Sequence, residues 1–261
     1  MNAALTISEL RRLTTRIEGS VARIELRHPP LNVIDLPMME ELASCLAEIE
    51  ARPDVSVIVF CGSGKAFSAG VDVAAHTPDN VEQMLAKFHG VIRSLVASKK
   101  VTIAGGHGHC LGGGAELAMV CDIVYTTEDA QWGFPEIKLG CYPPVACAAL
   151  AALIGQKRAS ELILTGRSIS GREAAQIGLA TAAVSGDLEA AVEECVGNLL
   201  SLSPATLAVT KKALYAWDSI HFDKGLARAE KTYFEDLMKT ADAHEGIRAF
   251  MEKRAPKWTG R

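Results

Sequence analysis

Two acidic residues and a cluster of glycines near the middle of the chain have the types and spacing for acid–base chemistry at a carbonyl group. The segment CLGGGAELAMVCD (residues 110–122) places Glu116 among apolar residues, and Glu136 follows a Phe-Pro pair 20 positions later. Glycines at a helix start let the backbone approach a ligand closely, and the free N–H groups there favour negative charge. Two such amides would stabilise a carbonyl oxygen that gains negative charge while the acids move protons.

A third segment, KAFSAGVD (residues 65–72), forms an expected loop after a buried strand. Each part has an ordinary explanation when taken singly. A glutamate in a first helical turn, such as Glu116, complements the helix dipole, and an acid after Phe-Pro, such as Glu136, is usually a solvated loop residue. The three segments together indicate a catalytic centre, because two acids at one site raise at least one pKa and can share acid–base roles.

Two glycine-rich segments fail as nucleotide-binding motifs. GSGK (residues 62–65) has Val59 where a phosphate loop needs its first glycine, and Ala66 where it needs a hydroxyl residue. The segment GGHGHCLGGG (residues 105–114) has Leu111 where the third glycine of a dinucleotide fingerprint would stand. These segments therefore favour turns over a nucleotide cofactor.

The histidines and serines of the same region also give no complete motif. His107, His109 and Cys110 have a metal-like spacing, but no further ligand cluster accompanies them, so we expect no metal site. Ser68 lies between Phe67 and Ala69 and lacks the Gly-x-Ser-x-Gly context of a serine hydrolase. A Ser-His-Asp hydrolase is therefore disfavoured.

The elements that must position these residues alternate between strand and helix patterns. Strands are indicated by period-two alternation or by continuous β-branched runs, and helices by 3.6-residue periodicity. Strands are expected at Val21–Arg27, Val55–Cys61, residues 101–105 and Asp122–Thr126, and helices from Pro37 to residue 50 and at Val81–Ala97. After Pro143 the pattern is mostly helical, with Val145–Ile154, Lys157–Leu164, Gly171–Ile177, Leu188–Leu200 and a long stretch from Pro204. We therefore predict an α/β core of strand–strand–helix units over residues 1–203 and a helical segment over residues 204–261.

Composition narrows the classes of partner and compartment. The chain has 261 residues, 49% of them hydrophobic, and a net charge of −4, which argues against nucleic-acid or anionic-membrane surfaces. The longest apolar run, Val145–Ile154, is too short to span a bilayer, and the first residues lack a signal-peptide pattern. Seven cysteines without a Cys-x-x-Cys pair fit reduced thiols. We expect a cytoplasmic protein.

Five segments together resemble the crotonase family, the enoyl-CoA hydratase/isomerase superfamily, along almost the whole chain. They are FSAGVD (residues 67–72), CLGGGAELAMVCDIVY (110–125), GFPEIKLG (133–140), LTGRSISGREAAQIGLA (164–180) and EGIRAFMEKRAPKW (245–258). The resemblance implies a crotonase-like spiral with a C-terminal helical segment, and a hydro-lyase acting on an acyl-CoA thioester. No separate cofactor is implied, because CoA is part of the substrate.

The resemblance also assigns roles to individual residues. It makes the backbone N–H groups of Val71 and Gly113 the oxyanion hole. It makes Glu116 the base that activates water and Glu136 the acid at the α-carbon. The residues that it implies for substrate binding are Ala69, Asp72, Val73, Ala74, Gly112, Phe234 and Lys253.

Phe234 and Lys253 match positions that in some family members contact the CoA nucleotide from a neighbouring subunit. Their ordinary alternatives are a core aromatic and a surface lysine. The resemblance further implies a homotrimer or a homohexamer, in which the helical tail packs against neighbours; a helical cap on its own domain is the alternative.

Three stretches depart from the commonest hydratase pattern: CYPPVACAALAALIG (residues 141–155), PPLNVID (29–35) and HTPD (76–79). Together they resemble the cyclohexa-1,5-diene-1-carbonyl-CoA hydratases of anaerobic aromatic degradation, which implies an acyl pocket shaped for a ring. A short-chain 2-enoyl-CoA hydratase of fatty-acid or amino-acid degradation and a 3,2-enoyl-CoA isomerase remain the alternatives. A non-catalytic acyl-CoA-binding relative would be expected to lack a glutamate.

Overall fold

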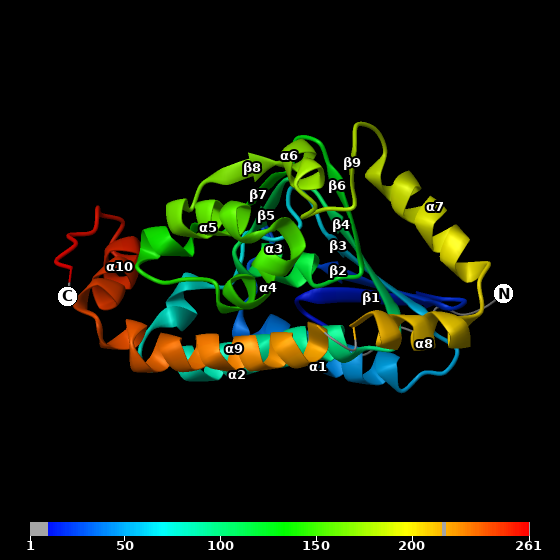
Figure 1. Cartoon of the computed structure of the whole chain (residues 1–261), viewed down its shortest axis with the longest axis horizontal. Coiled ribbons are helices and arrows are strands. Elements are labelled where there is room, and N and C mark those ends of the chain that lie inside the picture. Colours follow the sequence, from blue (N-terminus) through cyan, green and yellow to red (C-terminus); the bar gives the residue numbers. More distant parts are fainter. Residues whose placement is uncertain (1–9, 216–217, 261) are drawn as a thin grey trace.

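A six-stranded, mostly parallel sheet forms the centre of the computed structural model, which describes residues 10–215 and 218–260 (Figure 1). The strand order is β1-β2-β3-β4-β6-β9, and only the β1–β2 pair is antiparallel. The strands are β1 (Leu13–Glu18), β2 (Val21–Leu26), β3 (Val57–Gly62), β4 (Val101–Gly106), β6 (Ile123–Thr127) and β9 (Ala182–Val184). The four strands expected from sequence patterning are all confirmed within two residues at each end.

A second, three-stranded sheet carries the segments around the glycine cluster. It consists of β5 (His109–Leu111), β7 (Gln131–Gly133) and β8 (Ser168–Ser170), in that order. A short helix, α3 (Gly113–Met119), follows β5 directly. Strands of three residues show too little periodicity to be recognised, so the sequence did not predict this sheet.

Helices cover both faces of the large sheet (Figure 1). On one face lie α1 (Leu36–Glu50) and α2 (Val81–Ala97), and on the other α7 (Leu188–Leu200). Strand β3 shows why its sequence is continuously apolar: Ile58 and Phe60 join the core under α1 and α2, whereas Val57 and Val59 pack with the residues of α7. The expectation of a strand buried on both faces is therefore confirmed.

The helical second half folds back over the core (Figure 1). The single turn η1 (Val73–His76) follows β3 in the first half of the chain. The shorter elements of the second half include η2 (Pro135–Leu139), α4 (Pro144–Ile154), α5 (Gln156–Thr165) and α6 (Gly171–Gln176). The last segment comprises α8 (Pro204–Tyr215), α9 (Asp218–Glu235), η3 (Leu237–Lys239) and α10 (Ala241–Met251). Helix α9 packs against α4 and α2 of its own chain, so it forms one side of the space between these two helices.

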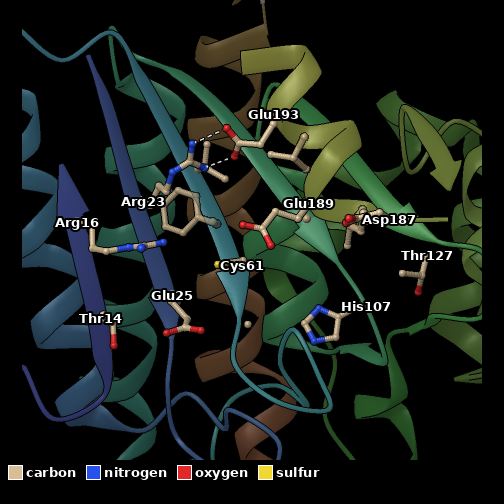
Figure 2. A pocket seen from close by; sticks show the side chains of 16 residues that line it. Thr14, Arg16, Arg23, Glu25, Cys61, His107, Thr127, Asp187, Glu189 and Glu193 are labelled. Carbon is tan, nitrogen blue, oxygen red and sulfur yellow. Dashed lines mark hydrogen bonds and ion pairs between the residues drawn. The ribbon is translucent and has the colours of Figure 1, made fainter. Parts of the chain in front are cut away.

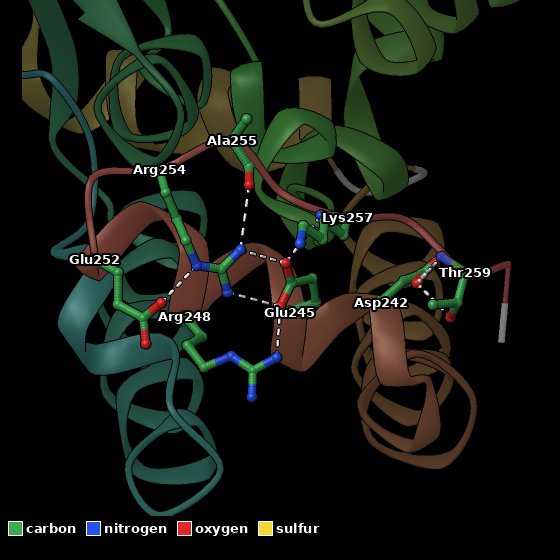
Figure 3. A network of polar contacts seen from close by, with 8 residues as sticks. All are labelled: Asp242, Glu245, Arg248, Glu252, Arg254, Ala255, Lys257 and Thr259. Atoms are coloured by element: carbon green, nitrogen blue, oxygen red, sulfur yellow. Dashed lines mark hydrogen bonds and ion pairs between the residues drawn. The ribbon is translucent and has the colours of Figure 1, made fainter.

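A carboxylate on α10 fixes the C-terminal tail (Figure 3). Glu245 accepts hydrogen bonds from Arg254 at 2.6 and 2.9 Å, from Arg248 at 2.6 Å and from the backbone N–H of Lys257 at 2.9 Å. The guanidinium groups of Arg254 and Arg248 hold the pKa of this carboxyl well below its usual range. The chain after α10 is thereby tied back onto the helix.

None of the described helices is long and apolar enough to cross a membrane. All seven cysteines are free, and Cys147 on α4 is the exposed one.

A buried ion pair attaches α8 to the sheet. The Lys211 ammonium lies 2.7 Å from Oδ2 of Asp122 and donates to the carbonyl of Lys100 at 2.8 Å. The same Asp122 oxygen accepts from the N–H and hydroxyl of Thr102 at 2.7 and 2.9 Å. Both charged side chains are almost fully buried.

Replacing Lys211 by methionine should therefore destabilise the protein strongly. Removing one member of a buried pair leaves the other charge without compensation, which costs about 3–5 kcal/mol. We expect a correspondingly lower midpoint in urea unfolding. The adjacent exposed Lys212 provides the control, because Lys212→Met should change the midpoint little. Equal effects of the two substitutions would contradict the anchoring role of Lys211.

Candidate active site

Asn32 holds the loop of residues 65–72 in place. This buried residue has a φ of 52°, and its side-chain amide donates to the carbonyls of Ser63 at 2.9 Å and Ala66 at 2.7 Å. The hydroxyl of Ser68 donates to the carbonyl of Asn32 at 2.7 Å and accepts from the N–H of Gly70 at 3.1 Å. Ser68 is thus a structural element of the loop, consistent with the expectation that it is not a hydrolase nucleophile.

The loop brings the amide of Val71 next to that of Gly113. A methyl group built on Gly113 would lie 3.3 Å from the Val71 nitrogen, and one on Gly70 would lie 3.5 Å from the Gly113 nitrogen. Val71 bridges to Ile34, whose own hydrogen bonds involve Gly70 and Asp72. Within residues 10–215 and 218–260, neither the Val71 nor the Gly113 N–H has a hydrogen-bond acceptor. The two amides predicted as an oxyanion hole are therefore neighbours with free donors.

Gly112 opens α3 with a conformation that brings Glu136 close. Its φ is 51°, and a methyl group there would lie 2.6 Å from Oε1 of Glu136. The positive φ explains the glycine, since side-chain-bearing residues rarely adopt it. The missing side chain leaves the space that the Glu136 carboxyl occupies.

Glu116 is buried but anchored. Its side chain, on α3, accepts a hydrogen bond at 2.9 Å from the N–H of Ala146, in the first turn of α4. Burial raises the pKa of Glu116 to about 7, and the backbone amides of Ala146 and Val145 oppose this rise. Amides and the dipole of a helix N-terminus stabilise a carboxylate, so they favour the charged form of this acid.

Glu136 is buried without such support. It lies on η2, and its Oε2 has no hydrogen-bond partner among the described residues. Burial, followed by the charge of Glu116, raises the pKa of Glu136 to about 8. The pair therefore favours a state at neutral pH in which Glu116 is the carboxylate and Glu136 keeps its proton.

Both acids and both amides line one cavity of about 70 Å³. Its wall is largely apolar and includes side chains from α2, η2 and α9. Residues that complete the lining without having been predicted are Gly70, His76, Met84, Leu85, Phe88, His89, Pro135, Leu139, Tyr142, Pro144 and Tyr233. A lone histidine or aromatic residue on an amphipathic helix gives no sequence signal for such a position.

The remaining predicted substrate-binding residues divide into two groups. Ala69, Val73 and Gly112 line the cavity. Asp72 instead caps η1, where its side chain accepts from the N–H of Ala74 at 3.1 Å, and neither residue reaches the cavity wall. Substrate binding by Asp72 and Ala74 stays a prediction, and Asp72 shapes the turn that carries Val73.

Phe234 and Lys253 lie away from this cavity. Phe234 packs edge-on against Tyr233, with ring centroids 6.2 Å apart, and is partly buried against the core. Lys253 is exposed after α10 with a φ of 54°. The prediction for these two residues concerns a neighbouring subunit and stays a prediction.

A larger hollow of about 780 Å³ lies between strands β1–β4 and α7 (Figure 2). Its charged side chains include Arg23, which forms an ion pair with Glu193 at 2.7 Å, and Glu25 and Glu189. It contains His107 of the rejected metal motif but neither acid nor amide of the predicted centre. The chemistry predicted from the sequence therefore belongs to the smaller cavity.

Known proteins that are similar to this chain belong to one family. The sequence profile of the enoyl-CoA hydratase/isomerase family matches residues 16–261. The chain belongs to the enoyl-CoA hydratase/isomerase family. It is 33% identical over 244 residues to the cyclohexa-1,5-dienecarbonyl-CoA hydratase of Thauera aromatica, covering 94% of this chain and 95% of that protein. It is 34% identical over 255 residues to a probable enoyl-CoA hydratase of Bacillus subtilis, with 95% and 98% covered.

Solved structures of the family share the fold. A crystal structure of an enoyl-CoA hydratase from Mycobacterium avium subsp. paratuberculosis superposes with a TM-score of 0.87 at 27% identity. The match covers 96% of this chain and all of that one. The crotonase-like fold expected from the sequence is therefore confirmed.

The raised pKa values of the two acids predict an unusual dependence of stability on pH. In the folded protein they lose their protons near pH 7 and 8, against about 4.3 for glutamate in an unfolded chain. The folded state therefore binds more protons between these values, and its stability falls as pH rises from about 4.5 to 8.

Glu136→Gln removes one of these groups and should raise the melting temperature by a margin that grows between pH 5 and pH 8. Thermal unfolding measured across this range tests the expectation. For Glu82→Gln, which changes an exposed acid of α2, the difference from the native protein should not follow the same trend. A margin for Glu136→Gln that stays constant or shrinks with rising pH would refute the pKa assignment.

Proposed function

We propose that this protein is an enoyl-CoA hydratase, a hydro-lyase that adds water across a double bond conjugated to a CoA thioester. One observation carries the proposal: two buried carboxyl groups share a cavity with two main-chain amides that have free donors. The amides suit an oxygen that gains negative charge, and the carboxyls suit the two proton transfers of hydration.

In this mechanism the thioester oxygen accepts hydrogen bonds from the amides of Val71 and Gly113. Glu116, as the carboxylate, takes a proton from water, and the water oxygen bonds to the β-carbon. The electron pair of the double bond moves towards the thioester, and the two amides stabilise the resulting enolate oxygen. The α-carbon then takes the proton of Glu136. A proton passing from Glu116 to Glu136 restores the starting state.

The unequal surroundings of the acids support this division of roles. The amides at the start of α4 favour the charged form of Glu116, and the unpartnered Oε2 of Glu136 favours its protonated form. Two titratable groups whose environments separate their pKa values are typical of a base and an acid in one site.

For the acyl group we propose a cyclic dienoyl thioester such as cyclohexa-1,5-diene-1-carbonyl-CoA. Support comes from the hydratase of that name in Thauera aromatica, to which this chain is similar along 94% of its length. The apolar cavity wall of Met84, Leu85, Phe88 and Leu139 is compatible with a hydrocarbon ring. A short-chain 2-enoyl-CoA hydratase is the second candidate, since the Bacillus subtilis relative is named a probable enoyl-CoA hydratase.

A 3,2-enoyl-CoA isomerase is less well supported. Moving a double bond requires one group that removes a proton from one carbon and returns it to another. That reaction does not need a second buried carboxyl in the same cavity, whereas the proposed addition of water uses both Glu116 and Glu136. The presence of both glutamates likewise disfavours a non-catalytic acyl-CoA-binding protein.

We also propose that the chain assembles into a homotrimer or homohexamer in which Phe234 and Lys253 approach the CoA nucleotide of a neighbour. Large apolar side chains exposed on the outer helices support an assembly. They include Leu153, Leu164, Val209, Leu214, Phe250 and Met251.

Glu116→Gln and Glu136→Gln should each lower the hydration rate by about 10²- to 10⁴-fold, the usual contribution of a general acid or base. Formation of 3-hydroxyacyl-CoA from an enoyl-CoA, followed by mass, measures the effect. Glu82→Gln should retain the native rate. If both cavity variants hydrate normally, the proposed mechanism is wrong.

A panel of cyclic and linear enoyl-CoA thioesters, analysed by mass for added water, tests the acyl group. The proposed ring substrate predicts a higher kcat/KM for cyclohexa-1,5-diene-1-carbonyl-CoA than for crotonyl-CoA. A higher value for crotonyl-CoA would favour the short-chain hydratase. Double-bond migration without any hydroxyacyl-CoA would identify an isomerase instead.

A further inference from the structure

One wall of the active-site cavity carries a polar group that the hydration mechanism does not use. His89, on α2, is fully buried and lines the cavity. Its Nδ1 lies 2.7 Å from Oε1 of Glu230, on α9. Arg93, one turn along α2, donates to both oxygens of Glu230 at 3.0 Å. The imidazole is therefore clamped between two helices that pack against each other.

The clamp fixes which nitrogen of His89 holds the proton. Burial alone would favour a neutral Glu230, but hydrogen bonds from Arg93 and His89 lower the pKa of Glu230, so it is a carboxylate. A carboxylate only accepts hydrogen bonds, so Nδ1 of His89 must carry the hydrogen. Burial lowers the pKa of His89, although Glu230 opposes this, so the ring is neutral at neutral pH. Nε2 is then a bare acceptor.

This acceptor has no partner within the described part of the chain. A buried polar atom without a hydrogen bond is rare in folded proteins and costs stability. The hydroxyl of Tyr233, on α9, belongs to the same cavity lining and interacts with the thiol of Cys141. His89 and Tyr233 stand beside apolar side chains of the acyl wall, such as Phe88 and Leu85. Nε2 of His89 can therefore bind a ligand group that donates a hydrogen.

A hydroxyl group has this property, because its hydrogen can be donated to Nε2 of His89. A ketone or aldehyde oxygen would present a lone pair to the lone pair of Nε2. A hydrocarbon would leave Nε2 of His89 unsatisfied. The cavity wall therefore discriminates among acyl groups by a hydrogen that the ligand donates.

We propose that the preferred acyl group carries a hydroxyl, on a carbon other than the α- and β-carbons, that donates a hydrogen bond to Nε2 of His89. The proposal rests on the enoyl-CoA hydratase function above and modifies the acyl group proposed there: the preferred ring carries one added hydroxyl. His89 is then a specificity-determining residue, and Glu230 and Arg93 position it.

Matched ring thioesters test this idea. Cyclohex-1-ene-1-carbonyl-CoA is compared with analogues that carry a hydroxyl, or a ketone, at each ring carbon other than the α- and β-carbons. We expect one hydroxyl isomer to exceed both the unsubstituted and the ketone compound in kcat/KM by roughly tenfold or more, because an unpaired buried acceptor weakens binding of the others. Crotonyl-CoA serves as the reference for hydration itself.

The variant His89→Phe should reduce this hydroxyl-to-unsubstituted ratio to about one. The ratio cancels any general effect of the substitution on folding or on the catalytic acids. His89→Gln, whose amide oxygen can accept a hydrogen bond, should retain part of the ratio. Met84→Leu, which changes the same wall without a polar atom, should leave the ratio unchanged.

The outcomes separate this proposal from the proposed function. Equal kcat/KM for the hydroxyl and unsubstituted compounds, or a preference for the ketone, overturns the hydroxyl proposal alone. A preference that survives in His89→Phe overturns the assignment to His89. If neither the ring thioesters nor crotonyl-CoA is hydrated, both the hydroxyl proposal and the proposed hydratase function are overturned.

Discussion

The burial of two carboxyl groups in one cavity is the constraint on which the rest of the site depends. Desolvation disfavours charge on either acid, and proximity disfavours charge on both, so protons stay bound at pH values where exposed glutamates are ionised. At pH values above the ordinary pKa of glutamate, such a pair lowers the stability of the folded state. The packing of the surrounding helices offsets this cost. In the proposed mechanism these protons are the ones that are transferred to and from the substrate.

The backbone, more than any side chain, gives the two acids different properties. Glu116 meets the N–H of Ala146 at the start of α4, whereas Glu136 has no such donor on its free oxygen. The segment of residues 141–155 contributes a main-chain amide to this contact. Any residue except proline supplies that amide, so side chains of the segment can change without removing the hydrogen bond to Glu116.

The same principle operates at the acyl end of the cavity. Helices α2 and α9 belong to distant parts of the chain, and their contact places a carboxylate behind an imidazole. The carboxylate sets the position of a proton on His89 and thereby the kind of atom the pocket accepts. Catalysis and specificity thus both depend on which hydrogen-bond partners a buried titratable group is given.

The sequence by itself determined the family, the two acids with their amides and most of the long elements, although the six-residue strand β1 (Leu13–Glu18) was not predicted. Long strands and helices repeat an apolar pattern often enough to be recognised, and the motifs around Val71, Gly113, Glu116 and Glu136 are local. Only the tertiary structure decided which groups form hydrogen bonds with the buried titratable side chains of the site. The anchor of Glu116 comes from a helix 30 residues away and the partner of His89 from one 141 residues away, and neither contact leaves a periodic trace. Short strands such as β5, β7 and β8 were likewise invisible, because three residues cannot display a period.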